Sequence, residues 1–198
     1  MLNQFDLNKA ERKLYLSYFD DGVADLLAGL PVILFGLGMT LEMKVFFVFT
    51  FLPMILYLPL KQAITLPRMG YVKFAPERRR RISKNLIALL LVGLLALLLI
   101  FVLFQGVLGR GLDLKSMTNE YNLLVVGALM AAPYALFSIL FGLMRFFGYA
   151  ALILGGWFIA IYTIPYEGIP VAVAGTLISL VGMLLLARFL ARTPPSSE

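Results

Sequence analysis

Residues 66–82 read LPRMGYVKFAPERRRRI, a strongly basic stretch between two apolar segments, residues 45–60 and 86–104. The whole chain of 198 residues is 61% hydrophobic and 14% charged, whereas a soluble domain is about half apolar and a quarter charged. A chain of this length cannot bury so much apolar surface within itself, so lipid must solvate part of it. The composition predicts a polytopic integral membrane protein.

Long apolar segments lie on both sides of this basic stretch. A helix needs about 20 predominantly apolar residues to cross a bilayer. Six segments qualify, of which the second is short and carries Pro53 and Pro59. The six are Gly22–Leu41, Val45–Leu60, Leu86–Phe104, Leu123–Met144, Phe146–Ile164 and Val171–Ala187. We therefore expect an all-α bundle of six transmembrane helices, with a tight turn at Arg145.

The positive charges follow the positive-inside rule if both termini are cytoplasmic. That orientation places 14 of the 17 lysines and arginines in the cytoplasm and leaves only Lys44, Arg110 and Lys115 outside. The run Arg78–Arg81 is then first of all a topology anchor. The predicted location is a cell membrane, crossed several times.

The chain is expected to form a single membrane domain, residues 1–198. Residues 1–21 have the composition of an amphipathic interfacial helix and no apolar region typical of a cleaved signal peptide. Residues 22–60 would form a first helical hairpin, 61–85 a basic cytoplasmic loop, 86–187 four further spans and 188–198 a tail.

The basic loop could also bind a ligand, because basic residues near a membrane surface each gain roughly 1 kcal/mol from anionic lipid. An acidic face of a partner protein could use the same charges. Nucleic acid is not expected, since topology already explains the excess charge. The candidate binding residues are Arg68, Tyr71, Lys73, Arg78, Arg79, Arg80, Arg81 and Lys84.

Asp25 is the main candidate for chemistry inside the membrane, because ionisable residues within a span are expensive and often functional. At about 100° per residue, Gly22, Asp25, Gly29 and Gly36 fall within about 60° of arc, so Asp25 is expected on a packed face. Asp21 and Arg145 are further candidates, and Arg145 could pair with Asp25. The alternative is a structural role, because carboxylates at a helix N-terminus are favoured by caps and by the helix dipole.

Small residues on helix faces allow close contact between helices in lipid. The candidate packing residues are Gly22, Gly29, Gly36, Gly155, Gly175 and Ser179. The spacing from Gly22 to Gly29 recurs from Gly148 to Gly155, a weak indication of a parallel repeat of the kind found in transporters.

An enzyme is not favoured, and no cofactor or metal site is predicted. The chain has no cysteine and no histidine, which removes thiolate and imidazole chemistry. The stretch DDGVAD, residues 20–25, is similar to the metal-binding aspartates of membrane prenyltransferases and to part of the CDP-alcohol phosphotransferase motif. The first family needs a second acidic motif and the second needs further aspartates and an arginine downstream, and this chain has no second membrane-proximal acidic cluster on that side.

Three stretches together resemble a group of small bacterial membrane proteins with a PRxGYVKF-type cytoplasmic loop. They are DGVADLLAG at 21–29, PRMGYVKF at 67–74 and RFLARTP at 188–194. The resemblance implies a protein of the bacterial cytoplasmic membrane and brings no known activity.

Two functions therefore remain open. The first is a packing or interaction subunit, self-associating or accessory to a larger membrane complex, whose basic loop contacts anionic lipid or a partner. The second is a small oligomeric transporter or channel that uses Asp25.

Overall fold

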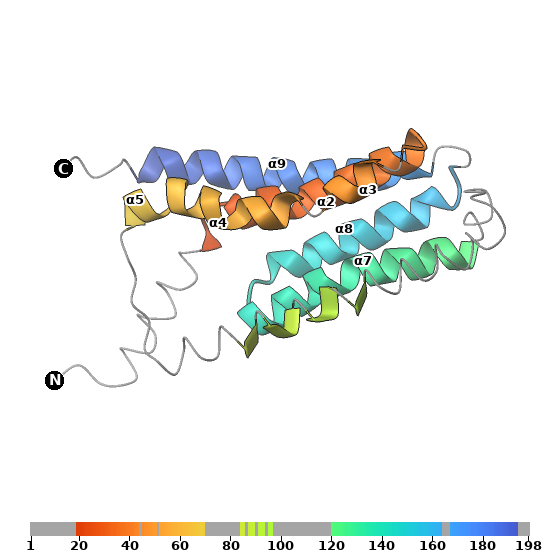
Figure 1. The fold of residues 1–198 in the computed structure, drawn as a ribbon, viewed down its shortest axis with the longest axis horizontal. Coiled ribbons are helices and arrows are strands. Elements are labelled where there is room, and N and C mark those ends of the chain that lie inside the picture. Colours follow the sequence, from red (N-terminus) through yellow and green to blue (C-terminus); the bar gives the residue numbers. More distant parts are fainter. Residues whose placement is uncertain are drawn as a thin grey trace.

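The structure, a computed structural model, describes residues 19–43, 45–50, 52–69, 84–85, 87–89, 91–93, 95–96, 120–163 and 167–193. Within these residues every regular element is a helix, as the sequence predicts (Figure 1). The labelled helices are α2 (Val23–Thr40), α3 (Val45–Phe49), α4 (Leu52–Ile64), α5 (Leu66–Met69), α7 (Glu120–Phe141), α8 (Arg145–Ala160) and α9 (Gly168–Arg192). Residues 84–85, 87–89, 91–93 and 95–96 are helical as well.

Three of the described helices are long and apolar enough to cross a membrane: α2, α7 over Leu123–Phe141, and α9. Helix α8 is apolar but has only 16 residues, fewer than the roughly 20 that a span normally needs. The described residues thus support a membrane protein with transmembrane helices, but three such helices rather than six. Most of the third expected span, 86–104, lies outside the described residues.

The second expected span, Val45–Leu60, is divided between α3 and α4. Proline has no N–H and restricts the residue before it, so Pro53 cannot continue the hydrogen bonding of α3 but is tolerated in the first turn of α4. Thr50 closes α3 by donating its hydroxyl to the carbonyl of Phe47 at 2.6 Å. At its other end α4 continues to Ile64, so Lys61 belongs to a helix and not to the expected loop.

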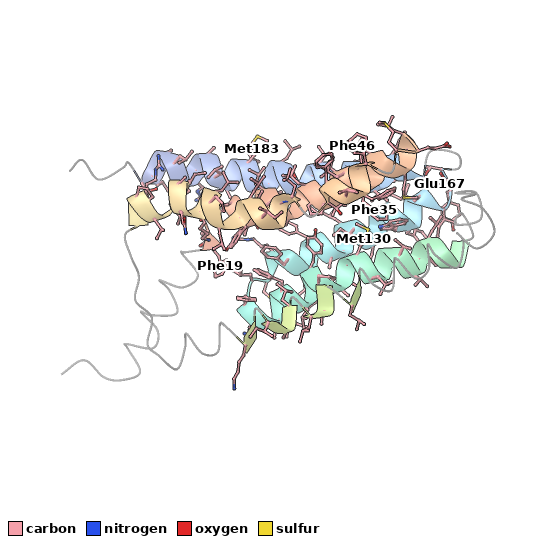
Figure 2. All side chains as sticks on the ribbon, in the orientation of Figure 1. Phe19, Phe35, Phe46, Met130, Glu167 and Met183 are labelled. Atoms are coloured by element: carbon pink, nitrogen blue, oxygen red, sulfur yellow. The ribbon has the colours of Figure 1, made fainter. Side chains whose placement is uncertain are left out.

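The helices form two layers, with α2, α4 and α9 in one and α7 and α8 in the other (Figure 1). Helix α2 contacts α3, α4 and α9, and α9 also contacts α8. Aromatic side chains fill the space between the layers: Phe35 of α2 meets Trp157 of α8 with ring centroids 5.7 Å apart. Figure 2 shows Phe35 and Met130 directed into this space, while Met183 points away from it.

The closest helix pair joins the first and last described long helices. Glycines recur every seven residues on both helices, at 22, 29 and 36 in or beside α2 and at 168, 175 and 182 in α9. Because the helices are antiparallel, Gly22 meets Gly182, Gly29 meets Gly175 and Gly36 meets Gly168. A Cβ atom at Gly175 would lie 2.6 Å from the amide nitrogen of Ile33, so the two backbones are in direct contact.

The expected packing role of Gly22, Gly29, Gly36 and Gly175 agrees with this glycine contact, and Ser179 lies within it. Ser179 also donates its hydroxyl to the carbonyl of Leu26 at 3.3 Å. Gly155 does not fit the same expectation, because a Cβ there would have no atom of the described residues within 4 Å. Its neighbour Gly156 faces α9 instead, with the carbonyl of Pro170 3.0 Å from the Cβ position. A helix turns about 100° per residue, so adjacent glycines face different neighbours.

The tight turn expected between the fourth and fifth spans lies at residues 142–144. Gly142 adopts φ of 71°, a left-handed conformation that favours glycine after a helix. Ser138 donates its hydroxyl to the carbonyl of Leu143 at 3.0 Å and so stabilises the turn. Arg145 is the first residue of α8, not the connector, and its side chain therefore starts at the end of the bundle where α2 begins.

Candidate functional site

Charged side chains gather at one end of the described bundle, where α2 and α8 begin and α4 and α9 end. Asp21 and Asp25 are fully buried there, and Lys61 is nearly so. The acidic side chains Glu42 and Glu167 belong to the opposite end (Figure 2 labels Glu167). We call Asp20, Asp21, Asp25, Lys61, Thr65, Arg145 and Tyr149 the charged cluster.

Asp21 connects the start of α2 to α4. One carboxylate oxygen, Oδ2, lies 3.1 Å from Nζ of Lys61 and accepts a hydrogen bond of 2.5 Å from the hydroxyl of Thr65. The other, Oδ1, accepts the backbone N–H of Val23 at 3.2 Å, which satisfies one of the free N–H groups at the start of α2. Lys61 and Thr65 are four residues apart on a helical turn, so both reach the same carboxylate.

Lys61 is held in an apolar surrounding, with a side chain only 3% exposed. Its ammonium lies 4.7 Å from the centre of the Phe19 ring and 5.5 Å from that of Tyr57, both within reach of a cation–π interaction. Burial lowers the pKa of Lys61, while the neighbouring Asp21 carboxylate acts in the opposite direction. The ion pair with Asp21 therefore compensates for part of the loss of water.

Asp25 lies one turn further into α2 and is 0% exposed. Its Oδ1 accepts a hydrogen bond of 2.8 Å from the Tyr149 hydroxyl. Nε of Arg145 is 2.7 Å from the same oxygen, a distance typical of an ion pair, although the N–H direction does not make a hydrogen bond. The second oxygen, Oδ2, has no hydrogen-bond partner among the described residues.

Arg145 bridges a buried and an exposed carboxylate. Its Nη1 donates to Oδ1 of Asp20 at 2.7 Å, and its Nη2 donates to the carbonyl of Phe19. The Asp20 side chain is 59% exposed, and that of Arg145 is 23% exposed. The guanidinium thus makes its hydrogen bonds to Asp20 and Phe19, while its interaction with Asp25 is mainly the attraction between opposite charges.

The structure brings together the three intramembrane candidates: Asp21, Asp25 and Arg145 all belong to the charged cluster. Sequence reasoning missed Lys61, because that residue was assigned to the loop, and also Thr65 and Tyr149. A signal for the first two was available in the four-residue spacing of Lys61 and Thr65. Nothing in the sequence pattern indicates that Tyr149 faces Asp25.

Of the eight basic-loop candidates, only Arg68 and Lys84 lie within the described residues. Arg68 lies in the last turn of the short helix α5 and donates from Nη1 to the carbonyl of Ile64 at 2.9 Å. Lys84 is exposed. Tyr71, Lys73 and Arg78–Arg81 lie outside the described residues, so the predicted role of the loop stays a prediction.

The cluster consists of paired charges. In the described part of the chain, no three acidic residues are grouped so as to hold a metal ion. Two cations, Lys61 and Arg145, lie at ion-pair distance from the buried carboxylates. The chemistry that this arrangement can perform is ion pairing and proton exchange.

Comparison with protein-family models, with curated proteins and with solved structures gives no match for this chain. Its fold and charged cluster are therefore interpreted from the residues themselves.

Proposed function

We propose that this chain is a small integral membrane protein that acts as a packing or interaction subunit, either by self-association or as an accessory to a larger membrane complex. In this proposal it crosses the bacterial cytoplasmic membrane six times, with both termini in the cytoplasm. Its basic loop contacts anionic lipid headgroups or an acidic partner. It belongs with the small bacterial membrane proteins that share the PRxGYVKF-type loop.

The observation that carries the proposal is the pairing of buried charges. Asp21 is paired with Lys61 and Asp25 with Arg145, all at one end of the helices. Deeper in the bundle the described contacts are mainly aromatic or between glycines, together with hydrogen bonds from the hydroxyls of Tyr134 and Ser179 to backbone carbonyls. A path for a charged substrate would be expected to place ionisable groups along the helices, whereas these charges hold helix ends together.

The outward surfaces of the described helices support the same proposal. Large apolar side chains are exposed on α4, α8 and α9, among them Ile55, Phe158 and Leu184. Such surfaces are suited to lipid or to another membrane helix. The described lysines and arginines lie at the end where α2 begins, which favours that end as the cytoplasmic one.

The test is gentle purification from native membranes, followed by intact mass measurement of what co-purifies. A second protein in fixed proportion, lost when Arg78–Arg81 are all changed to Gln, would support an accessory subunit. A matched control changes Arg188 and Arg192, which are basic but outside the loop. A lone monomer that shows no preference for anionic over neutral vesicles would contradict the proposal.

The second candidate is an oligomeric transporter or channel that uses Asp25. It is favoured by one specific observation, the buried Oδ2 of Asp25 that has no hydrogen-bond partner among the described residues. Flux of protons or monovalent cations into liposomes would test it. Asp25→Asn should abolish the flux while leaving the protein folded, and flux unchanged in this variant would exclude the mechanism.

A further inference from the structure

We propose that Asp25 is a proton-binding site. A proton bound to Asp25 takes the place of the Arg145 guanidinium, which then pairs with Asp20 alone. The ligand is a single proton, and the acceptor is the Oδ2 oxygen of Asp25. The site requires no transport activity, so it holds for either candidate function.

The two carboxylate oxygens of Asp25 have different surroundings. Oδ1 receives the Tyr149 hydroxyl at 2.8 Å and lies 2.7 Å from Nε of Arg145. Oδ2 is buried without a hydrogen-bond partner among the described residues. A buried carboxylate oxygen without a donor is costly, because it loses its water and gains no replacement. Adding a proton to Oδ2 removes the charge that requires solvation.

The geometry of Arg145 supports the same site. Its hydrogen bonds are made to the exposed Asp20 carboxylate and to the carbonyl of Phe19, not to Asp25. Its contact with Asp25 is close but poorly aligned. Moving the guanidinium fully to Asp20 would therefore keep its best hydrogen bonds and give up mainly the Coulomb attraction to Asp25.

Proton uptake removes the buried negative charge. Before it, Asp25 is negative and Arg145 compensates for it; afterwards Asp25 is neutral and Arg145 lies with Asp20. The proton comes from a hydronium ion of the solvent, in which an O–H bond breaks as one forms at Oδ2; no bond within the protein breaks, and Arg145 keeps its own protons. An arginine does not lose its charge in proteins, so it can change partner but cannot supply the proton.

The other groups around Asp25 allow this exchange. Asp21 lies one turn away and is already paired with Lys61 of α4. Tyr149 of α8 can donate to Oδ1 in either protonation state. Helix α9 meets the backbone of Asp25 and Leu26 with Gly182, which brings no charge.

The experiment is a pH titration of the whole protein in detergent, where no flux is possible, followed by infrared difference spectroscopy. A protonated carboxylic acid has a carbonyl band that a carboxylate lacks. We expect one such band on mild acidification, shifted by ¹³C-labelled aspartate and absent from Asp25→Asn. Absence of the band in the unmodified protein, or its persistence in Asp25→Asn, would overturn the proposal.

Three variants test the exchange with Arg145. Arg145→Gln should raise the proton affinity roughly tenfold or more, because a competing cation is removed. Tyr149→Phe should raise it less, and Asp20→Asn should lower it, because Arg145 then has no alternative carboxylate. If Arg145→Gln does not fold, the exchange is tested by the other two variants, whose protonation midpoints should shift in opposite directions. Midpoints that stay unchanged in both would contradict the exchange.

Discussion

Helix α2 has two contact surfaces of different kinds. Toward α9 it presents glycines at positions 22, 29 and 36, and the contact is made by backbone atoms. Toward α4 and α8 its N-terminal end presents Asp21 and Asp25, and the contact is made by ion pairs. The first contact is specified by the absence of side chains and the second by charge complementarity, so the two should respond differently to substitution.

The largest effect is expected from breaking a buried ion pair. Asp21→Asn leaves the Lys61 ammonium without its carboxylate while it is only 3% exposed. Removing one partner of such a pair typically lowers the free energy of unfolding by about 3–5 kcal/mol. The measurement is unfolding in mixed micelles, followed by circular dichroism.

Two further variants sharpen this result. The control Asp20→Asn removes a carboxylate that is 59% exposed, and such pairs contribute about 0–1 kcal/mol. The double variant Asp21→Asn with Lys61→Met should regain much of the stability, because no unpaired charge remains buried. A double variant as unstable as the single one would show that the unpaired Lys61 charge is not the cause of the loss, since asparagine can still cap α2.

A smaller but still clear effect is expected at the glycine contact. In Gly29→Ala the new Cβ would lie 2.6 Å from the amide nitrogen of Ser179, so α2 and α9 must separate. Overpacking of this kind costs about 1–3 kcal/mol. The same unfolding measurement applies.

Gly155→Ala is the matched control for this glycine, because a Cβ there meets no described atom within 4 Å. In α8 this change should leave stability unchanged or raise it by up to about 1 kcal/mol, since alanine is the better helix former. Equal destabilisation by both variants would mean that helix flexibility, and not close contact, accounts for Gly29.

The next effect concerns the hydrogen bond to Asp25. Tyr149→Phe removes the only aligned donor that the described residues offer to this carboxylate, and hydrogen bonds to charged groups contribute about 1.5–3 kcal/mol. Arg145 remains, so we expect a loss near the lower end of that range, measured as before. Tyr162→Phe serves as the control, because this tyrosine is exposed and its ring, which phenylalanine keeps, makes the contact with Phe158. If Tyr149→Phe leaves the free energy of unfolding unchanged, the buried Asp25 is stabilised by Arg145 alone.

The sequence predicted the glycine surfaces better than the charged cluster, for a physical reason. Small residues at fixed spacing mark a helix face by local geometry, so Gly29, Gly36 and Gly175 could be recognised without knowing their partner. The partner itself was not predictable, because nothing local indicates that the first and last long helices meet. An ion pair depends on residues from separate helices, so Lys61 and Tyr149 were missed.

The second expected span was predicted as one continuous helix, because the hydrophobic pattern continues across the break between α3 and α4 that Pro53 introduces.

The smallest effect is expected from the polar atom inside the glycine contact. Ser179→Ala removes a hydrogen bond of 3.3 Å to the carbonyl of Leu26 but keeps a side chain of nearly the same size. Hydrogen bonds between membrane helices contribute about 0.6 kcal/mol on average, so the loss should be small and far below that of Gly29→Ala. Ser179→Val adds volume at the same position, where the hydroxyl already lies close to Gly29, and should be much more destabilising. If Ser179→Ala were instead the more damaging change, this side of α2 would also be held by polar contacts, and the distinction between its two surfaces would fail.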